Sequence, residues 1–188
     1  MRVCIYAQPR TGSTVLSSYI SNQLGLLNIV EPYNIKNPTY HSDEQVWLDP
    51  STTVKFLFGG LRSEQQTSLH QYFDKVIVLT REDDIAGGES HLMALITGKW
   101  EPYEYNITKF DQEQNIKLQE TIKLRAEIRK QMKALPYFQV TYEEIFYRTV
   151  GITNINSYLY IKQDNSDIDM FNLKHKYRRD PINKKSLI

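Results

Sequence analysis

The chain of 188 residues is 40% hydrophobic and 12% aromatic, which suits one sizeable hydrophobic core and is short for two domains. Its 23 lysines and arginines are balanced by 22 aspartates and glutamates, so the chain lacks the overall positive charge with which proteins attract nucleic acid. The single cysteine excludes an internal disulfide framework, and no leader or membrane span is predicted. We therefore expect one domain over residues 1–188, located in the cytoplasm, with no nucleic-acid partner.

Predicted strands and helices alternate along the first 150 residues. The first strand is Val3 to Ala7, a continuous apolar run that is typical of a strand covered on both faces. Apolar residues at helical spacing then predict a helix that ends at Gly25. Later strands are expected at residues 26–30, 54–58, 75–80 and 137–141, and helices at residues 15–24, 62–73, 85–96, 118–135 and 142–149. This alternation predicts an α/β fold of three layers, in which helices flank a parallel, P-loop-like sheet.

The segment QPRTGST, residues 8–14, follows the first strand directly. In a parallel sheet, the turn from the first strand to the first helix is where an anion meets the free amides of the helix N-terminus. Gly12 lets the backbone approach an anion, Ser13 and Thr14 add hydroxyl donors, and Arg10 adds a permanent positive charge. The segment therefore predicts an oxyanion-binding loop.

Two common phosphate loops do not match this segment. A Walker A loop requires the pattern GxxxxGK followed by Ser or Thr, and here Gly12 is followed by Ser13 with no lysine. Cys4 and Arg10 match the spacing of the tyrosine phosphatase loop, but apolar strand residues lie between them. We therefore expect Cys4 to pack in the core.

The loop instead resembles the 5′-phosphosulfate loop of sulfotransferases, whose donor is 3′-phosphoadenosine 5′-phosphosulfate (PAPS). The residues that this resemblance assigns to the donor's sulfate end are Arg10, Thr11, Gly12, Ser13 and Thr14. The later segment KVIVLTREDDIAGGES resembles the family's 3′-phosphate motif, in which Arg81 and Ser90 are the matching residues. A guanidinium at a strand end and a hydroxyl on the next helix together suit a phosphate. Their separation of nine residues is closest to the bacterial trehalose-type branch.

Two further donor contacts follow from the resemblance. The segment QVTYEEIFYRT is similar to the family's motif near the adenine, so Tyr142 either contacts the base or packs in the core. The pattern of elements weakens from Gly151, and a basic tail begins at about residue 174. Late basic loops close the 3′-phosphate site in many family members, which makes Arg178 and Arg179 candidates for that role; the alternative is a solvated terminus.

The resemblance also implies a mechanism without a metal. Sulfuryl transfer is expected to follow the in-line, loose displacement of phosphoryl transfer, with Arg10 stabilising the bridging oxygen as 3′,5′-ADP leaves. The acceptor hydroxyl needs a base. Glu31 lies where the trehalose-type and tyrosylprotein branches have a catalytic carboxylate, and its alternative role is to cap the turn before Pro32. His41 is the rival base because its ordinary pKa suits proton abstraction at neutral pH.

The sequence thus predicts a PAPS-dependent sulfotransferase that acts on a hydroxyl of a sugar, glycolipid or other small molecule. A degenerate relative that binds a nucleotide or a partner without catalysis is the second hypothesis. A P-loop kinase that uses ATP is the third, and the missing Walker lysine argues against it.

Overall fold

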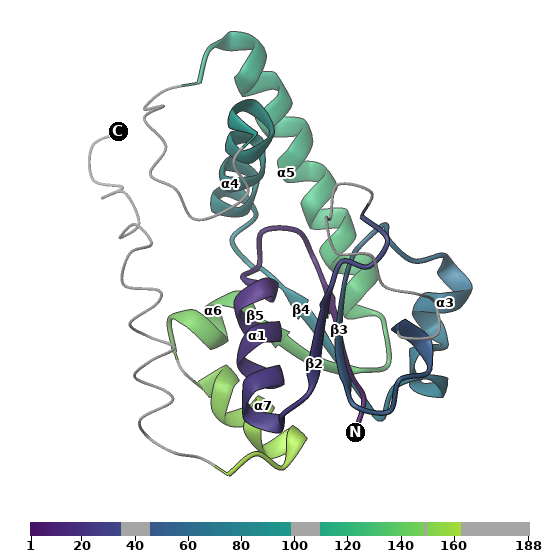
Figure 1. The fold of residues 1–188 in the computed structure, drawn as a ribbon. Coiled ribbons are helices and arrows are strands. Elements are labelled where there is room, and N and C mark those ends of the chain that lie inside the picture. Colours follow the sequence, from purple (N-terminus) through teal and green to yellow (C-terminus); the bar gives the residue numbers. More distant parts are fainter. Residues whose placement is uncertain (35–45, 99–109, 149, 163–188) are drawn as a thin grey trace.

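The computed structural model describes residues 1–34, 46–98, 110–148 and 150–162, and these residues form a parallel sheet flanked by helices (Figure 1). The five strands of this sheet lie in the order β2-β3-β1-β4-β5, and all neighbouring pairs are parallel. Their bounds are Leu27–Val30 for β2, Thr52–Leu57 for β3, Val3–Ala7 for β1, Lys75–Thr80 for β4 and Phe138–Thr141 for β5. The predicted α/β fold is confirmed.

Helices cover both faces of the sheet. Figure 1 shows α1, α6 and α7 together on one side and α3 on the other. The helical elements are α1 (Ser13–Leu24), α3 (Ser63–Thr67), the 3₁₀ turn η1 (Leu69–Gln71), α4 (Asp84–Thr97), α5 (Gln112–Lys133), α6 (Tyr142–Phe146) and α7 (Val150–Leu159). None of these described helices is both long and apolar enough to cross a bilayer. The layers match the three that the sequence predicts.

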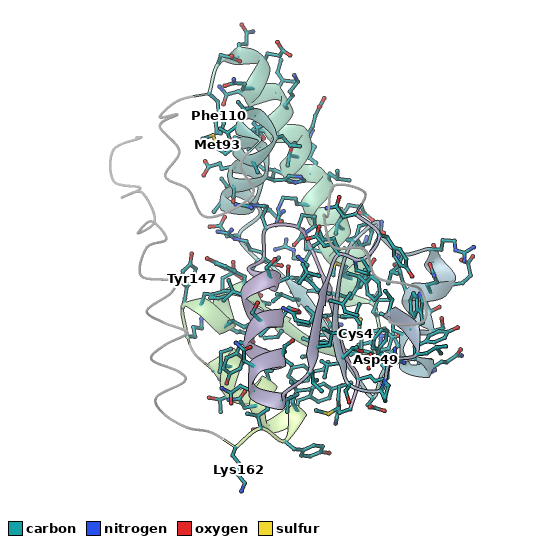
Figure 2. The ribbon with its side chains drawn as sticks, viewed as in Figure 1. Cys4, Asp49, Met93, Phe110, Tyr147 and Lys162 are labelled. Carbon is teal, nitrogen blue, oxygen red and sulfur yellow. The ribbon has the colours of Figure 1, made fainter. Side chains whose placement is uncertain are left out.

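The central strand β1 explains why its sequence is apolar throughout. Val3, Ile5 and Ala7 pack with α1 and α7 on one face, whereas Cys4 and Tyr6 pack on the opposite face. Because successive side chains of a strand point to opposite faces, a strand between two helical layers must be apolar at every position. Burial also raises the pKa of Cys4, as expected for a thiol that belongs to the core, and Figure 2 labels this residue within the sheet.

The pair α4 and α5 extends beyond the sheet, and Figure 2 labels Met93 and Phe110 on this projecting part. Gly87 and Gly88 of α4, whose low helix propensity would weaken the start of this helix, lie buried against α5. A Cβ atom built on Gly88 would lie 2.9 Å from Cγ1 of Ile122. The glycines therefore allow a close approach of the two helices, and this approach outweighs their low helix propensity.

Several elements differ from those expected: α5 begins six residues earlier, at Gln112, and α6 ends at Phe146. The predicted helix over residues 62–73 is divided into α3 and η1, and α7 forms where the sequence pattern weakens. A Cβ atom on Gly151 would lie 2.8 Å from the backbone nitrogen of Ile145, so α7 packs closely on α6. This tertiary contact stabilises a helix start that contains a glycine.

Candidate functional site

The two candidate anion loops meet at the carboxyl edge of the sheet. Residues 8–12 follow β1 and residues 81–83 follow β4, its neighbour in the sheet. The backbone nitrogen of Gln8 donates to the carbonyl of Leu79 (3.0 Å), and its side-chain Oε1 accepts from the backbone nitrogen of Arg81 (3.2 Å). Gln8 therefore fixes one loop against the other.

The first loop turns through two left-handed residues, Arg10 (φ 62°) and Gly12 (φ 71°). The hydroxyl of Thr11 donates to the carbonyl of Gln8 (2.7 Å), so this side chain closes the loop. Within this fully described stretch, Gly12 caps α1 without a side-chain hydrogen bond, and no acidic residue lies in the first turn. The amides at the start of α1 thus have the arrangement that favours an anion.

Arg10 joins the two loops. Its Nε donates to Oγ of Ser90 on α4 (3.0 Å), and its carbonyl accepts from Nη1 of Arg81 (3.4 Å). The resemblance assigns Arg10 and Ser90 to opposite ends of the donor, whereas here the two side chains are in contact. The structure thus brings together three of the predicted donor residues.

Arg81 lies in a pocket with a carboxylate and an aromatic ring. Its guanidinium lies 4.4 Å from the ring centroid of Tyr142, and its Nε lies 3.9 Å from Oε1 of Glu143. Arg81 is only 8% exposed, and its Nε has no hydrogen-bond partner among the described residues. Glu143 also accepts from the backbone nitrogens of Glu82 (3.0 Å) and Asp83 (3.1 Å), so it orients the whole second loop.

Tyr142 is buried beside the first loop. Its ring lies 4.5 Å from that of Phe146 and 5.5 Å from that of Tyr147, measured between centroids. Tyr147 is 61% exposed, and Figure 2 labels it at the outer side of α6. A Cβ atom on Gly12 would meet Phe146 at 2.6 Å, so α6 and the first loop are in direct contact. This packing agrees with the core role of Tyr142, and its second expected role, at adenine, stays a prediction.

A second cluster lies on the other side of β1, around Lys55 of β3. The Lys55 ammonium donates to Oε1 of Glu31 (2.5 Å) and to Oγ1 of Thr14 (2.9 Å), and the residue is 1% exposed. Burial by itself would raise the pKa of Glu31, but the Lys55 ammonium outweighs it and keeps the pKa below its ordinary value. Glu31 is therefore an ionised carboxylate beside the candidate sulfate loop.

Glu31 also has the turn role that the sequence analysis offered as its alternative. Its backbone is left-handed (φ 49°), its carbonyl accepts from the backbone nitrogen of Asn34 (3.0 Å), and its Oε2 accepts from Nδ2 of the same residue (2.9 Å). One carboxylate oxygen thus faces the turn and the other faces Lys55. The turn fixes the direction of the carboxylate.

Three residues that the structure places at the candidate site escaped the sequence analysis. Lys55 is a lysine inside an apolar strand, which is a signal in itself because an unpaired ammonium is rarely buried. Glu143 follows Tyr142 directly within the recognised segment. The third, Arg125 of α5, is buried against the first loop.

Several expected residues lie outside the described part of the chain. These are the rival base His41 and the tail residues Arg178 and Arg179. Over the described residues, no group of three histidines, cysteines, aspartates or glutamates is arranged to hold a metal ion.

Comparison with known proteins identifies the fold. No family model and no curated protein matches the sequence. Among solved structures, mouse sulfotransferase SULT7A1 complexed with PAP is similar, with a TM-score of 0.58 and 13% sequence identity over 92% of this chain. The chain spans 63% of the length of that neighbour. The protein thus has a sulfotransferase-like P-loop fold, and this likeness does not favour the trehalose-type branch over others.

Proposed function

We propose that the protein transfers a sulfuryl group from PAPS to a hydroxyl of a sugar, glycolipid or other small molecule. The observation that supports this most is the contact of the two loops through Arg10, Ser90 and Arg81 at one edge of the sheet. The second support is the fold, which is similar to that of a sulfotransferase complexed with PAP. The spacing of Arg81 and Ser90 remains the reason to consider a trehalose-type acceptor.

The residues present fit a donor with two separated anionic groups. The amides at the start of α1, with Ser13 and Thr14, suit the 5′-phosphosulfate. Arg81, whose buried Nε makes no hydrogen bond to any described residue, and Ser90 suit the 3′-phosphate. Tyr142 would border the adenine, and Arg178 and Arg179 of the tail are proposed to close the 3′-phosphate side.

The residues of the chain would divide the chemistry among them. PAPS supplies the sulfuryl group, and Arg10 neutralises charge on the oxygen that bridges it to the nucleotide. Glu31 is proposed to accept the proton of the acceptor hydroxyl; Lys55 keeps its carboxylate ionised and so able to take a proton, but also lowers its basicity. His41 is the alternative base.

Binding without catalysis is the second candidate function. The observation in its favour is that Arg10 and Ser90, which the resemblance assigns to opposite ends of the donor, are in contact (3.0 Å). Arg10→Ala separates the candidates. An enzyme would lose turnover and keep much of its donor affinity, whereas a binding protein has no turnover to lose.

The proposed domain organisation and cellular location of the protein rest on its composition. We propose that residues 1–188 form one domain and act in the cytoplasm, where a single buried cysteine needs no disulfide partner.

Calorimetric titration with 3′,5′-ADP, 5′-AMP and ATP tests the proposed function. We expect 3′,5′-ADP to bind about tenfold more tightly than 5′-AMP, which corresponds to about 1.4 kcal/mol. Arg81→Met should abolish that preference. Lys75→Met is the matched control, because Lys75 begins the strand that Arg81 follows and so lies at the opposite sheet edge. Equal binding of 3′,5′-ADP and 5′-AMP to the unmodified protein would refute the proposal, and a preference for ATP with magnesium would favour a kinase.

A further inference from the structure

A third guanidinium is buried beneath the two loops. Arg125 of α5 is 2% exposed. Its Nη1 donates to the carbonyl of Pro9 (2.8 Å), and its own backbone carbonyl accepts from Nε2 of Gln8 (2.9 Å). The side chain of Gln8 also accepts from the backbone nitrogen of Arg81. Arg125 therefore lies where the two anion loops meet.

Most of the hydrogen-bonding capacity of Arg125 is unused. Its Nε and Nη2 are buried and have no hydrogen-bond partner among the described residues. A buried donor without a partner costs about 1–3 kcal/mol, and more when it carries charge. An arrangement this unfavourable is expected where a ligand supplies the missing acceptors.

The electrostatic surroundings of Arg125 are predominantly positive. Burial, and after it the nearby guanidinium of Arg81, lower the pKa of Arg125 to about 10, with further contributions in the same direction from Arg10 and Arg129. Asp84 opposes this effect, but its Oδ2 already pairs with Nη2 of Arg129 (2.7 Å). The cluster of guanidinium groups is therefore only partly neutralised, by Asp84 and by Glu143, whose Oε1 lies 3.9 Å from Nε of Arg81.

These cations converge on one face of α4. Gly87, Ser90 and His91 are spaced by three and four residues, so they share a face near the helix N-terminus. A Cβ atom on Gly87 would lie 2.5 Å from Nη2 of Arg125, and Arg10 donates to Ser90 on the same face. Burial lowers the pKa of His91, and both Arg125 and Arg10 contribute to that shift.

We infer that Arg125 is a further phosphate-binding guanidinium, which joins Arg81 in holding one phosphate dianion against this face of α4. The inference depends on the proposed function only for the identity of the phosphate, which is then the 3′-phosphate of the nucleotide. Its unpaired Nε and Nη2 provide the fork that binds two phosphate oxygens. Because the guanidinium is 2% exposed and packs against Gly87, the inference requires it to turn away from Gly87 when the phosphate binds, while Gln8 holds the backbone of α5 through the carbonyl of Arg125.

Calorimetry with 3′,5′-ADP and 5′-AMP on Arg125→Met tests this inference. We expect the affinity for 3′,5′-ADP to fall at least tenfold and that for 5′-AMP to change less than twofold. Lys130→Met is the matched control, because it removes the same charge from an exposed position of the same helix and should change neither affinity. Unchanged binding of both ligands to Arg125→Met, or an equal loss for both, would overturn the inference in favour of a structural role.

An internal ion pair is the structural alternative, since Oδ1 of Asp84 also lacks a hydrogen-bond partner among the described residues. If Arg125 serves only Asp84, then Asp84→Asn and Arg125→Met should lower the melting temperature alike and leave the preference for 3′,5′-ADP intact. That result would contradict the inference. Under the inference, Asp84→Asn keeps the preference and Arg125→Met loses it.

Two further measurements keep the inference separate from the proposed function. If the unmodified protein does not distinguish 3′,5′-ADP from 5′-AMP, the proposed function fails, and inorganic phosphate then tests the cluster alone. Phosphate should raise the melting temperature of the unmodified protein and not that of Arg125→Met; equal shifts overturn the inference. If Arg125→Met does not fold, the Nε–Hε NMR signal of Arg125 in the unmodified protein tests the inference instead. The signal is assigned as the one that is missing from the spectrum of Arg125→Lys. The signal should move with inorganic phosphate, and an unmoved signal overturns the inference.

Discussion

Lys55 and Glu31 form an ion pair in which the lysine is more deeply buried than the glutamate, so the loss of either partner should cost a different amount of stability. The Lys55 side chain is 2% exposed and that of Glu31 is 22% exposed. Removing the carboxylate leaves a buried ammonium without a countercharge, whereas removing the ammonium leaves a carboxylate that reaches water. We expect Glu31→Gln to lower the free energy of unfolding by about 3 kcal/mol and Lys55→Met by about 1 kcal/mol. Urea unfolding at pH 7 measures both, and the reverse order would contradict this account.

Repeating the unfolding measurements at acidic pH provides the control for this prediction. Because the folded protein holds the pKa of Glu31 below its ordinary 4.5, the carboxylate stabilises the fold fully above that pH. This contribution is lost as the pH falls from 4.5 through the lowered value, where the folded carboxylate takes up its proton. The stability difference between the unmodified protein and Glu31→Gln should therefore shrink in acid and stay constant from pH 6 to pH 8.

Individual site residues were predictable where a local pattern marked them. Arg81 ends a strand and Ser90 lies on the following helix, so the sequence indicates that both lie near one sheet edge. Arg125 carries no such local mark, and Lys55 is marked only as a lysine within a predicted strand. Their importance comes from burial and from partners 24 and 116 residues away in the chain, which one sequence does not reveal.

At the scale of elements, the turn between β1 and α1 depends on Gly12 in two ways. Its φ of 71° is unfavourable for other residues by roughly 1–2 kcal/mol, and a Cβ atom there would meet Phe146 at 2.6 Å. Gly25 at the other end of α1 has a similar φ of 63° and open space around it. We therefore expect Gly12→Ala to destabilise the fold by at least about 1 kcal/mol more than Gly25→Ala.

Thermal unfolding of the two glycine variants measures this difference, and calorimetry with 3′,5′-ADP extends it to the site. Gly25→Ala should bind the nucleotide normally, because it changes only the distant end of α1. Gly12→Ala should bind it more weakly. Equal stability of the two variants would mean that Phe146 moves aside without cost.

Elements were predictable where they carry their own periodicity. β1 and β4 have the bounds that the sequence predicts, since each is a continuous apolar run ended by polar residues. The start of α4 was harder to predict because its two glycines disfavour a helix locally. They are accommodated because they allow α5 to pack closely against α4. For the same reason α7 escaped prediction, because its contact with α6 is tertiary.

At the scale of the whole molecule, the nucleotide should stabilise the fold, because both loops join the central strands. A ligand at one hundred times its dissociation constant adds about 2.7 kcal/mol, which corresponds to a rise of roughly 5–10 °C in melting temperature at this chain length. Differential scanning fluorimetry with 3′,5′-ADP measures this rise. At the same concentration, 5′-AMP should give about half of it, and equal rises would contradict selective binding of the second phosphate.

The position of β1 between β3 and β4 has a consequence for ligand size. Lys55 lies on one neighbour of β1 and Arg81 follows the other, so two inter-strand steps, about 10 Å, separate the strands that carry them. Main-chain hydrogen bonds set the spacing of these strands. Side-chain replacements can therefore change the affinity for a ligand but not the strand spacing. We therefore expect a compact anion such as pyrophosphate to bind on one side of β1 only, whereas a longer ligand can contact residues of both neighbouring strands.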